Sequence, residues 1–246
     1  MESVALLSAA DEEARALLAA AESDWTRPVP HCPDWDAASL VRHTGGIFEW
    51  MAAVVSSRVR VSRRILDPAP DNLADLPSWY VGALDRTVEI LGSADPASES
   101  WTFSTTGDCR VGWWHRRLAV EVSIHRWDIE HAVARPGGPA PRGLGGGVAA
   151  AGIDEFLVEF LQGLLAQEDI EGLDGTLHIQ ATDAATEWWI DLDARGLTFS
   201  EPARADTEIR GTRSDLLLWL TNRRSPADLD VFGNRGIPDR WQQLRR

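Results

Sequence analysis

Apolar side chains recur at intervals of three and four residues through the first two thirds of the chain, a spacing typical of amphipathic helices. The pattern predicts five helices, over residues 2–23, 37–66, 73–92, 112–134 and 148–167. Asp36 is placed to cap the second helix, and segments containing proline or glycine separate the others. Long helices with short joints predict a helical bundle.

Beyond Gly172 the helical spacing gives way to short runs with strand-like alternation. Strands are expected over residues 176–181, 187–192, 197–199, 207–210 and 228–233, with an apolar helix over 216–220 and a C-terminal helix from residue 237. Thr212 or Ser214 can cap the apolar helix. We therefore predict two domains: a helical bundle over residues 1–170 and a smaller α+β domain over residues 171–246.

Composition excludes several classes of function. The 246 residues carry 24 basic and 38 acidic side chains, for a net charge of −14. This excess of acid argues against a nucleic-acid partner, because affinity for phosphate backbones comes from basic patches. Every basic residue is Arg, which excludes Schiff-base and lysine general-base chemistry, since both need an amine whose pKa can be lowered.

The sequence also predicts a soluble, cytoplasmic protein without a membrane partner. Its two cysteines, Cys32 and Cys109, form no paired or CxxC pattern, and this favours a reducing compartment. The N-terminus lacks the basic and apolar regions of a signal peptide, and no apolar run approaches the ~20 residues that span a bilayer. Glycine-rich phosphate loops and the GxSxG elbow are missing, so nucleotide cofactors and serine-hydrolase chemistry are disfavoured.

The fourth predicted helix carries two polar residues on its core-facing stripe. At 100° per residue the stripe contains Trp114, Leu118, Glu121, His125, Ile129 and Ala132. Burying an isolated carboxylate is costly, so Glu121 must be paired, neutralised or bound to a cation. The stripe therefore predicts that this helix contributes to a functional site.

The second helix carries His43 on the same side as its apolar residues, followed by Gly45 and Gly46. Those glycines leave room for a neighbouring helix or a ligand. Two neutral imidazoles and one carboxylate form a typical open zinc set, and facing helices of a bundle can supply it. We propose His43, Glu121 and His125 as a metal site.

The spacing leaves other interpretations open. The two histidines can be satisfied core residues, with Glu121 paired to Arg42 or Arg117. Asp128 can orient His125, although pairing with Arg126 or Arg42 is the favoured interpretation.

The remaining histidines and the cysteines carry weaker signals. His31 can be a fourth ligand, but a loop or capping role is favoured. His115 and His131 are expected near the surface, and His178 in a strand of the second domain. A thiol nucleophile at Cys32 or Cys109 has no supporting motif.

Two segments resemble a known family. Cys32-Pro33-Asp34-Trp35-Asp36, followed by Leu40 to Gly46, resembles the first motif of the mycothiol-dependent maleylpyruvate isomerase family, and Glu121 to Asp128 resembles its second. The resemblance implies a DinB-like up-down four-helix bundle that binds a divalent metal, usually zinc, and a C-terminal sterol-carrier-like α+β domain. By position, the family's ligands fall on His43, Glu121 and His125.

The resemblance also implies an activity. We expect an enzyme that uses mycothiol as thiol cosubstrate and a divalent metal, Zn²⁺, to attack a small electrophile, as an isomerase or S-transferase. An anionic electrophile such as maleylpyruvate requires Arg near the open face of the metal, and Arg223 and Arg224 are candidates. The alternatives are a metal-dependent hydrolase, or a non-enzymatic ligand-binding protein with a structural metal and a pocket built from Trp188, Trp189 and Trp219. The pattern leaves the oligomeric state open.

Overall fold

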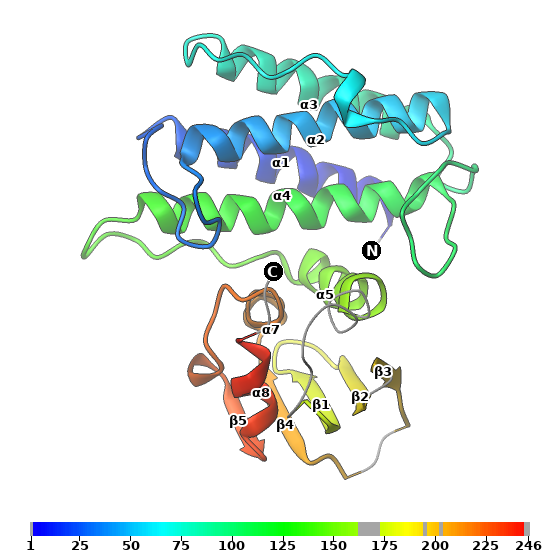
Figure 1. Cartoon of the computed structure of the whole chain (residues 1–246), viewed down its shortest axis with the longest axis vertical. Helices are drawn as coiled ribbons and strands as arrows, with labels where there is room; N and C mark the ends of the chain where they lie inside the picture. Colours follow the sequence, from blue (N-terminus) through cyan, green and yellow to red (C-terminus); the bar gives the residue numbers. More distant parts are fainter. Residues whose placement is uncertain (1, 162–172, 194–195, 202–203, 244–246) are drawn as a thin grey trace. The chain divides into compact units, whose positions relative to one another are not determined.

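The structure, a computed structural model, describes residues 2–161, 173–193, 196–201 and 204–243. The chain divides into two compact units, Met1–Val148 and Ala149–Arg246. The first is helical and the second combines helices with a five-stranded sheet, which confirms the predicted fold class (Figure 1). In the described part of the chain, no helix has both the length and the apolar character that crossing a membrane requires.

Four long helices form the N-terminal unit: α1 (Ser3–Ala21), α2 (Ala37–Ser57), α3 (Leu76–Ser93) and α4 (Val111–Val133). Each buries one apolar face, as its three- and four-residue spacing predicts. In α1, for example, Leu6, Ala10 and Leu17 are buried. The predicted helical bundle is therefore confirmed.

The helices of this bundle do not simply alternate in direction (Figure 1). Helices α1 and α4 run the same way, so Ser23 after α1 and Val133 at the end of α4 line one hollow. Helices α2 and α3 also share a direction, opposite to that of the first pair. The connection between them, residues 58–75, therefore returns along the bundle before α3 begins. The predicted up-down order would have placed α2 and α3 antiparallel and would have needed only a short joint between them. The observed order differs in this respect.

Helix α2 is shorter than the sequence predicted. Asp36 caps it as expected, because its Oδ1 accepts the backbone N–H of Ser39 at 2.8 Å. The helix ends where Arg58 adopts a left-handed conformation, with φ 63°. The prediction carried the helix to Leu66, where the segment Asp67–Pro70 was expected to stop it, but Ile65 is 76% exposed and marks no core face.

A buried ion network ties α4 to α1 and to the segment after α4. Arg126 has no exposed surface and pairs with Glu13 of α1 and with Glu130. It also donates to the backbone carbonyls of Arg142 and Gly143. A buried guanidinium is tolerated only when it is paired and its donors are satisfied, and these four acceptors meet that condition.

The C-terminal unit is built on a mixed sheet with the strand order β3-β2-β1-β4-β5. The strands are β1 (Gly175–Ala181), β2 (Glu187–Asp193), β3 (Gly196–Phe199), β4 (Thr207–Gly211) and β5 (Asp230–Gly233). Strands β1 and β4 pair in parallel, and all other neighbours pair antiparallel. The five predicted strands are confirmed, with small shifts at their ends.

Helices α7 (Arg213–Leu220) and α8 (Gly236–Trp241) cover one face of this sheet (Figure 1). The strand residues beneath them, among them Ile179 and Ile209, are fully buried. Thr212 caps α7 as predicted, with its hydroxyl accepting a backbone N–H at 3.1 Å. The core of this unit therefore lies between the helices and one side of the sheet.

The helix before the sheet, α5 (Gly146–Glu155), continues as a π-helical turn over Phe156–Phe160. The indole N–H of Trp188 in β2 donates to Asp154 at 2.7 Å, and this bond ties α5 to the C-terminal unit. The sequence placed this helix in the N-terminal domain, with the boundary after residue 170, a position outside the described residues. The two compact units divide in the first turn of α5.

Candidate metal centre

The three predicted ligands converge inside the bundle, His43 from α2 and Glu121 and His125 from α4. His43 Nε2 lies 3.3 Å from Glu121 Oε1, and His125 Nε2 lies 3.4 Å from the same oxygen. One ligand atom from each residue falls within 4.8 Å of the other two. Ligands of a tetrahedral zinc ion, each about 2.1 Å from the metal, lie about 3.4 Å apart. The two observed separations fit one shared ion.

Glu121 uses its two oxygens for different partners. Oε1 faces the histidines, and Oε2 forms an ion pair with Arg117, one turn earlier on α4. The pairing with Arg117 and the approach to the histidines were alternatives in the sequence, and the structure contains both. The guanidinium fixes the orientation of the carboxylate.

His43 is held in its neutral form. Burial, together with the neighbouring His125, Arg63 and Arg117, lowers its pKa to about 3. The ring of Trp35, from the first motif, lies 4.6 Å away and shields it. A neutral imidazole offers the lone pair that a metal requires, so this environment suits a ligand.

Asp128 orients the second histidine. Its carboxylate has no exposed surface, and Oδ2 lies 3.0 Å from His125 Nδ1. With the proton on Nδ1 shared with this carboxylate, Nε2 presents its lone pair to Glu121 and His43. The sequence favoured pairing of Asp128 with Arg126 or Arg42, but both arginines have other partners: Arg126 binds the buried network, and Arg42 donates to backbone carbonyls of residues 70 and 71.

Cys32 lies beside this pair, with Sγ 3.8 Å from Asp128 Oδ2. Cys32, His125 and Asp128 consequently form a second group whose ligand atoms lie within 4.8 Å of one another. Sequence reasoning gave Cys32 no role. Its place in the first motif, four residues before the Asp36 cap of α2, was the available signal.

A pocket of ≈ 550 Å³ opens beside His43. Its lining comes from α2 and from the α2–α3 connection: Arg42, His43, Gly46, Glu49, Arg63, Arg64, Leu66, Asp67, Pro68 and Ala69. The two glycines that follow His43 serve different purposes. A Cβ on Gly45 would lie 2.4 Å from the ring of Trp79 in α3, whereas a Cβ on Gly46 would meet nothing within 4 Å. Gly45 thus permits close helix packing, and Gly46 leaves the pocket open.

Two family models match most of the chain. The profile described as "Mycothiol maleylpyruvate isomerase N-terminal domain" matches residues 7–130, and that of the "MDMPI C-terminal domain" matches residues 147–240. The chain belongs to the mycothiol-dependent maleylpyruvate isomerase family. It is therefore a member of an enzyme family, as its two motifs predicted.

Solved structures show the same fold. The chain is similar to the crystal structure of the mycothiol-dependent maleylpyruvate isomerase, with a TM-score of 0.61 and 12% identity over 92% of this chain and 91% of that one. A mutant of that enzyme with one histidine replaced by alanine gives a TM-score of 0.63 and 11% identity over the same shares. No curated protein matches the sequence.

The other N-terminal histidines of this family member lie outside the three-ligand group. His31 Nε2 lies 3.0 Å from His131 Nδ1, and both rings pack against Trp127. His131 is thus half-buried rather than solvated. The prediction that His115 lies near the surface is wrong: the side chain is 1% exposed and its Nε2 lies 3.1 Å from the carbonyl oxygen of Leu91.

In the C-terminal unit, the predicted strand position of His178 is confirmed. It lies on β1, 2.8 Å from Glu187 and stacked on Trp189 at 3.8 Å. The two arginines considered for substrate binding are engaged within this unit. Arg224 pairs with Asp215 at 2.8 Å, and Arg223 donates to the carbonyl of residue 221.

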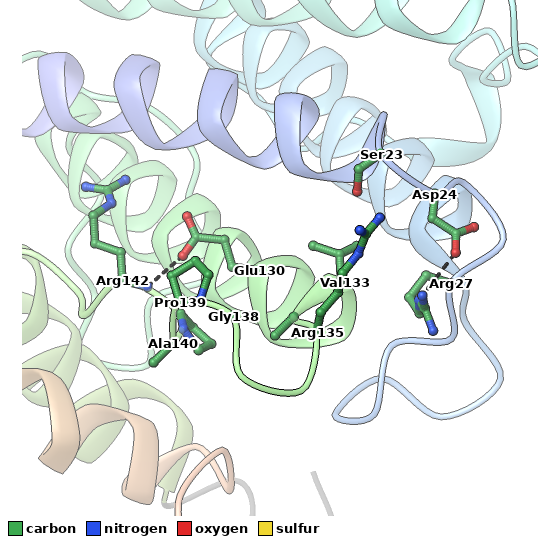
Figure 2. A pocket seen from close by; sticks show the side chains of 12 residues that line it. Ser23, Asp24, Arg27, Glu130, Val133, Arg135, Gly138, Pro139, Ala140 and Arg142 are labelled. Atoms are coloured by element: carbon green, nitrogen blue, oxygen red, sulfur yellow. Dashed lines mark hydrogen bonds and ion pairs between the residues drawn. The ribbon is translucent and has the colours of Figure 1, made fainter.

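A second hollow, of ≈ 570 Å³, lies at the C-terminal ends of α1 and α4 (Figure 2). Acidic groups on its wall already have partners: Glu130 accepts the backbone N–H of Arg142, and Asp24 pairs with Arg27. None of the three predicted ligands lines it. Of these two hollows, the pocket beside His43 is the one that reaches the candidate metal centre.

Proposed function

We propose that the chain is a metal-dependent, mycothiol-using isomerase or S-transferase that binds a divalent ion, Zn²⁺, through His43, Glu121 and His125. The observation that carries this proposal is the convergence of two imidazole nitrogens on one carboxylate oxygen at 3.3 and 3.4 Å. Two nitrogens and one carboxylate oxygen suit zinc and leave a position for an exogenous ligand. Membership of the family indicates mycothiol as the thiol cosubstrate.

The residues around the three ligands support this role. Asp128 holds the Nδ1 proton of His125, and Arg117 holds the second oxygen of Glu121. Burial keeps His43 neutral, so no proton has to leave it on metal binding at neutral pH. A bound divalent ion lowers the pKa of a coordinated thiol, so that a thiolate nucleophile is available at neutral pH.

The chemistry that follows depends on the electrophile. Addition of a thiolate to an activated double bond, rotation about the resulting single bond and elimination of the same thiolate give cis–trans isomerisation and regenerate the thiol. Attack without elimination gives a stable thioether and makes the protein an S-transferase. The pocket beside His43 is open enough to admit such an electrophile next to the ligand set.

Metal analysis and thiol-dependent turnover test the proposal together. We expect purified protein to bind a stoichiometric divalent metal and to isomerise maleylpyruvate with mycothiol. His43→Ala and Glu121→Gln should lose metal affinity by more than the about 10–100-fold typical of residues that only support a ligand. His131→Ala is the matched control, because this half-buried histidine of the same helix lies outside the ligand group, and it should keep both metal and activity.

Two results would contradict the proposal. Unchanged metal content in both ligand variants would show that His43 and Glu121 do not bind the metal. Turnover that persists without any thiol would instead favour a hydrolase with a metal-activated water. Formation of a stable thioether rather than the trans product would select the S-transferase form.

A further inference from the structure

The α2–α3 connection carries an unusual group of arginines. Arg60, Arg63 and Arg64 lie within five residues of one another in a chain with 38 acidic side chains. Ten of the other described arginines bind carboxylates: Arg15, Arg27, Arg86, Arg110, Arg117, Arg126, Arg142, Arg210, Arg213 and Arg224. Within the described residues, no carboxylate pairs with Arg60, Arg63 or Arg64. What sets these three cations apart is that they lie together on one connection of an acidic protein.

Aromatic rings hold two of these guanidinium groups. Arg63 lies over Trp50 of α2, 4.7 Å from the ring centroid, and Arg60 lies 5.8 Å from the ring centroid of Trp101. Stacking on a ring fixes a guanidinium plane and leaves its edge, with its N–H donors, free for a planar anion. The indole N–H of Trp50 donates to the carbonyl of Val61 at 2.9 Å, which anchors the connection to α2. Arg63 is therefore positioned before any ligand arrives.

Arg63 and Arg64 line the same pocket as the metal-ligand candidate His43. Two acidic residues also line this pocket, Glu49 and Asp67, but Glu49 is neutralised by its ion pair with Arg86 of α3. The pocket wall is therefore positive, although the whole chain carries −14. A local positive wall is what an acidic protein needs to attract an anion.

We propose that Arg63, assisted by Arg64, binds a carboxylate of the electrophilic substrate and thereby selects anionic substrates for the metal centre. This inference rests on the proposed function, because it assigns the anion-binding group of the same site. A carboxylate accepts two parallel N–H donors from one guanidinium, and this geometry fixes the orientation of the substrate as well as its affinity. Arg63 is thus a specificity-determining residue, whereas Arg223 and Arg224, considered from the sequence, are bound within the C-terminal unit.

Succinate is a suitable probe, since it is a dicarboxylate without an electrophilic double bond. We expect it to bind the metal-loaded, full-length protein in isothermal titration, and uncharged succinamide to bind far more weakly. Arg63→Met should weaken succinate binding about 10- to 100-fold, the range of a lost charge-assisted bidentate pair. In turnover assays the same variant should raise KM for an anionic substrate much more than it lowers kcat.

Arg60→Met is the matched control. Arg60 belongs to the same connection and also stacks on a tryptophan, but it lines the neighbouring hollow and not the pocket beside His43. This variant should bind succinate like the wild type. Gly46→Leu gives an independent variant, because its side chain would project into the open pocket and should block succinate without removing any charge.

Three results would overturn the inference: no succinate binding by the wild type, equal affinity in Arg63→Met, or equal weakening by Arg60→Met. Metal content separates this inference from the proposed function. If Arg63→Met keeps its metal and its KM, the anion site is wrong while the metal proposal stands. If the ligand variants keep their metal but succinate binding still depends on Arg63, the metal proposal fails and the anion site stands.

Discussion

Asp128 is buried toward the C-terminal end of α4, where it pairs with His125. A carboxylate in that position fixes the proton of His125 on Nδ1 and increases the basicity of Nε2. An amide of the same shape can do neither reliably, because it can also donate to Nδ1 and reverse the tautomer.

We therefore expect Asp128→Asn to reduce metal affinity about 10–100-fold while the fold is retained. Titration against a competing chelator measures this change, and circular dichroism checks the fold. Cys32→Ser is the comparison variant: the weak contact of its thiol, at 3.8 Å, predicts a much smaller loss. Equal metal affinity in Asp128→Asn and wild type would show that His125 is oriented by something else.

At the level of single residues, the sequence identified what lies on one helix face. Glu121 and His125 share a stripe of α4, and His43 lies on the apolar side of α2, so periodicity alone selected all three. It could not select Arg63, because that residue lies in a connection whose path is set by tertiary packing rather than by a repeating angle. His115 was misplaced for a related reason. Its charged neighbours suggested a surface position, but the helix turns this side chain into the core.

Among the elements, α2 shows how adjacent residues of one type can take opposite roles. Gly45 faces α3, where the ring of Trp79 occupies the space of a side chain, while Gly46 faces the pocket. The sequence indicated that the two glycines leave room for a helix or for a ligand. The structure assigns one purpose to each.

The paired substitutions Gly45→Ala and Gly46→Ala should change stability in opposite directions. In Gly45→Ala the new methyl group would lie 2.4 Å from a ring carbon of Trp79, so the ring or the helix must shift, at a cost of about 1–3 kcal/mol. In Gly46→Ala the better helix propensity of Ala should stabilise the protein by up to about 1 kcal/mol. Urea unfolding midpoints measure both, and a similar loss in both variants would contradict the assignment.

The start of a helix was predictable where a side chain caps its first backbone N–H groups. Asp36 fixed the start of α2 and Thr212 the start of α7, since both are side-chain caps. The end of α2 was missed because a left-handed Arg58 has no sequence signature comparable to a glycine. The relative direction of α2 and α3 was also missed. Their long connection lets the two helices run in parallel, and the spacing of apolar residues carries no information on helix direction.

For the whole molecule, two neutral histidines, the half-buried His43 and the buried His115, link stability to pH. Burial is the main cause that lowers the pKa of His43 to about 3, and it also lowers that of His115, from an ordinary value of 6.5. As pH falls below 6.5, the unfolded chain takes up protons at these residues and the folded chain does not, so acidification favours unfolding. The stabilising effect is full above pH 6.5 and is lost progressively toward pH 3.

Metal-free protein should accordingly unfold at lower urea concentration at pH 5 than at pH 7. His115→Gln removes one of these groups and lies outside the ligand set. In this variant the urea midpoint should depend less on pH. The measurement is the urea midpoint across this range at constant ionic strength. An unchanged or rising midpoint on acidification would mean that neither histidine is held neutral by the fold.

The parallel course of α2 and α3 has a consequence for how this enzyme can evolve. The proposed metal ligands lie on helices whose sequence is constrained by packing, whereas Arg63 and Arg64 of the pocket lie on the connection over residues 58–75. Mutations in that exposed connection can therefore change which molecules are admitted without disturbing the bundle or its reactive centre. Because the proposed anion site and the proposed ligand set lie on different elements, we expect exchange of this one connection to change the preferred electrophile while metal binding is retained.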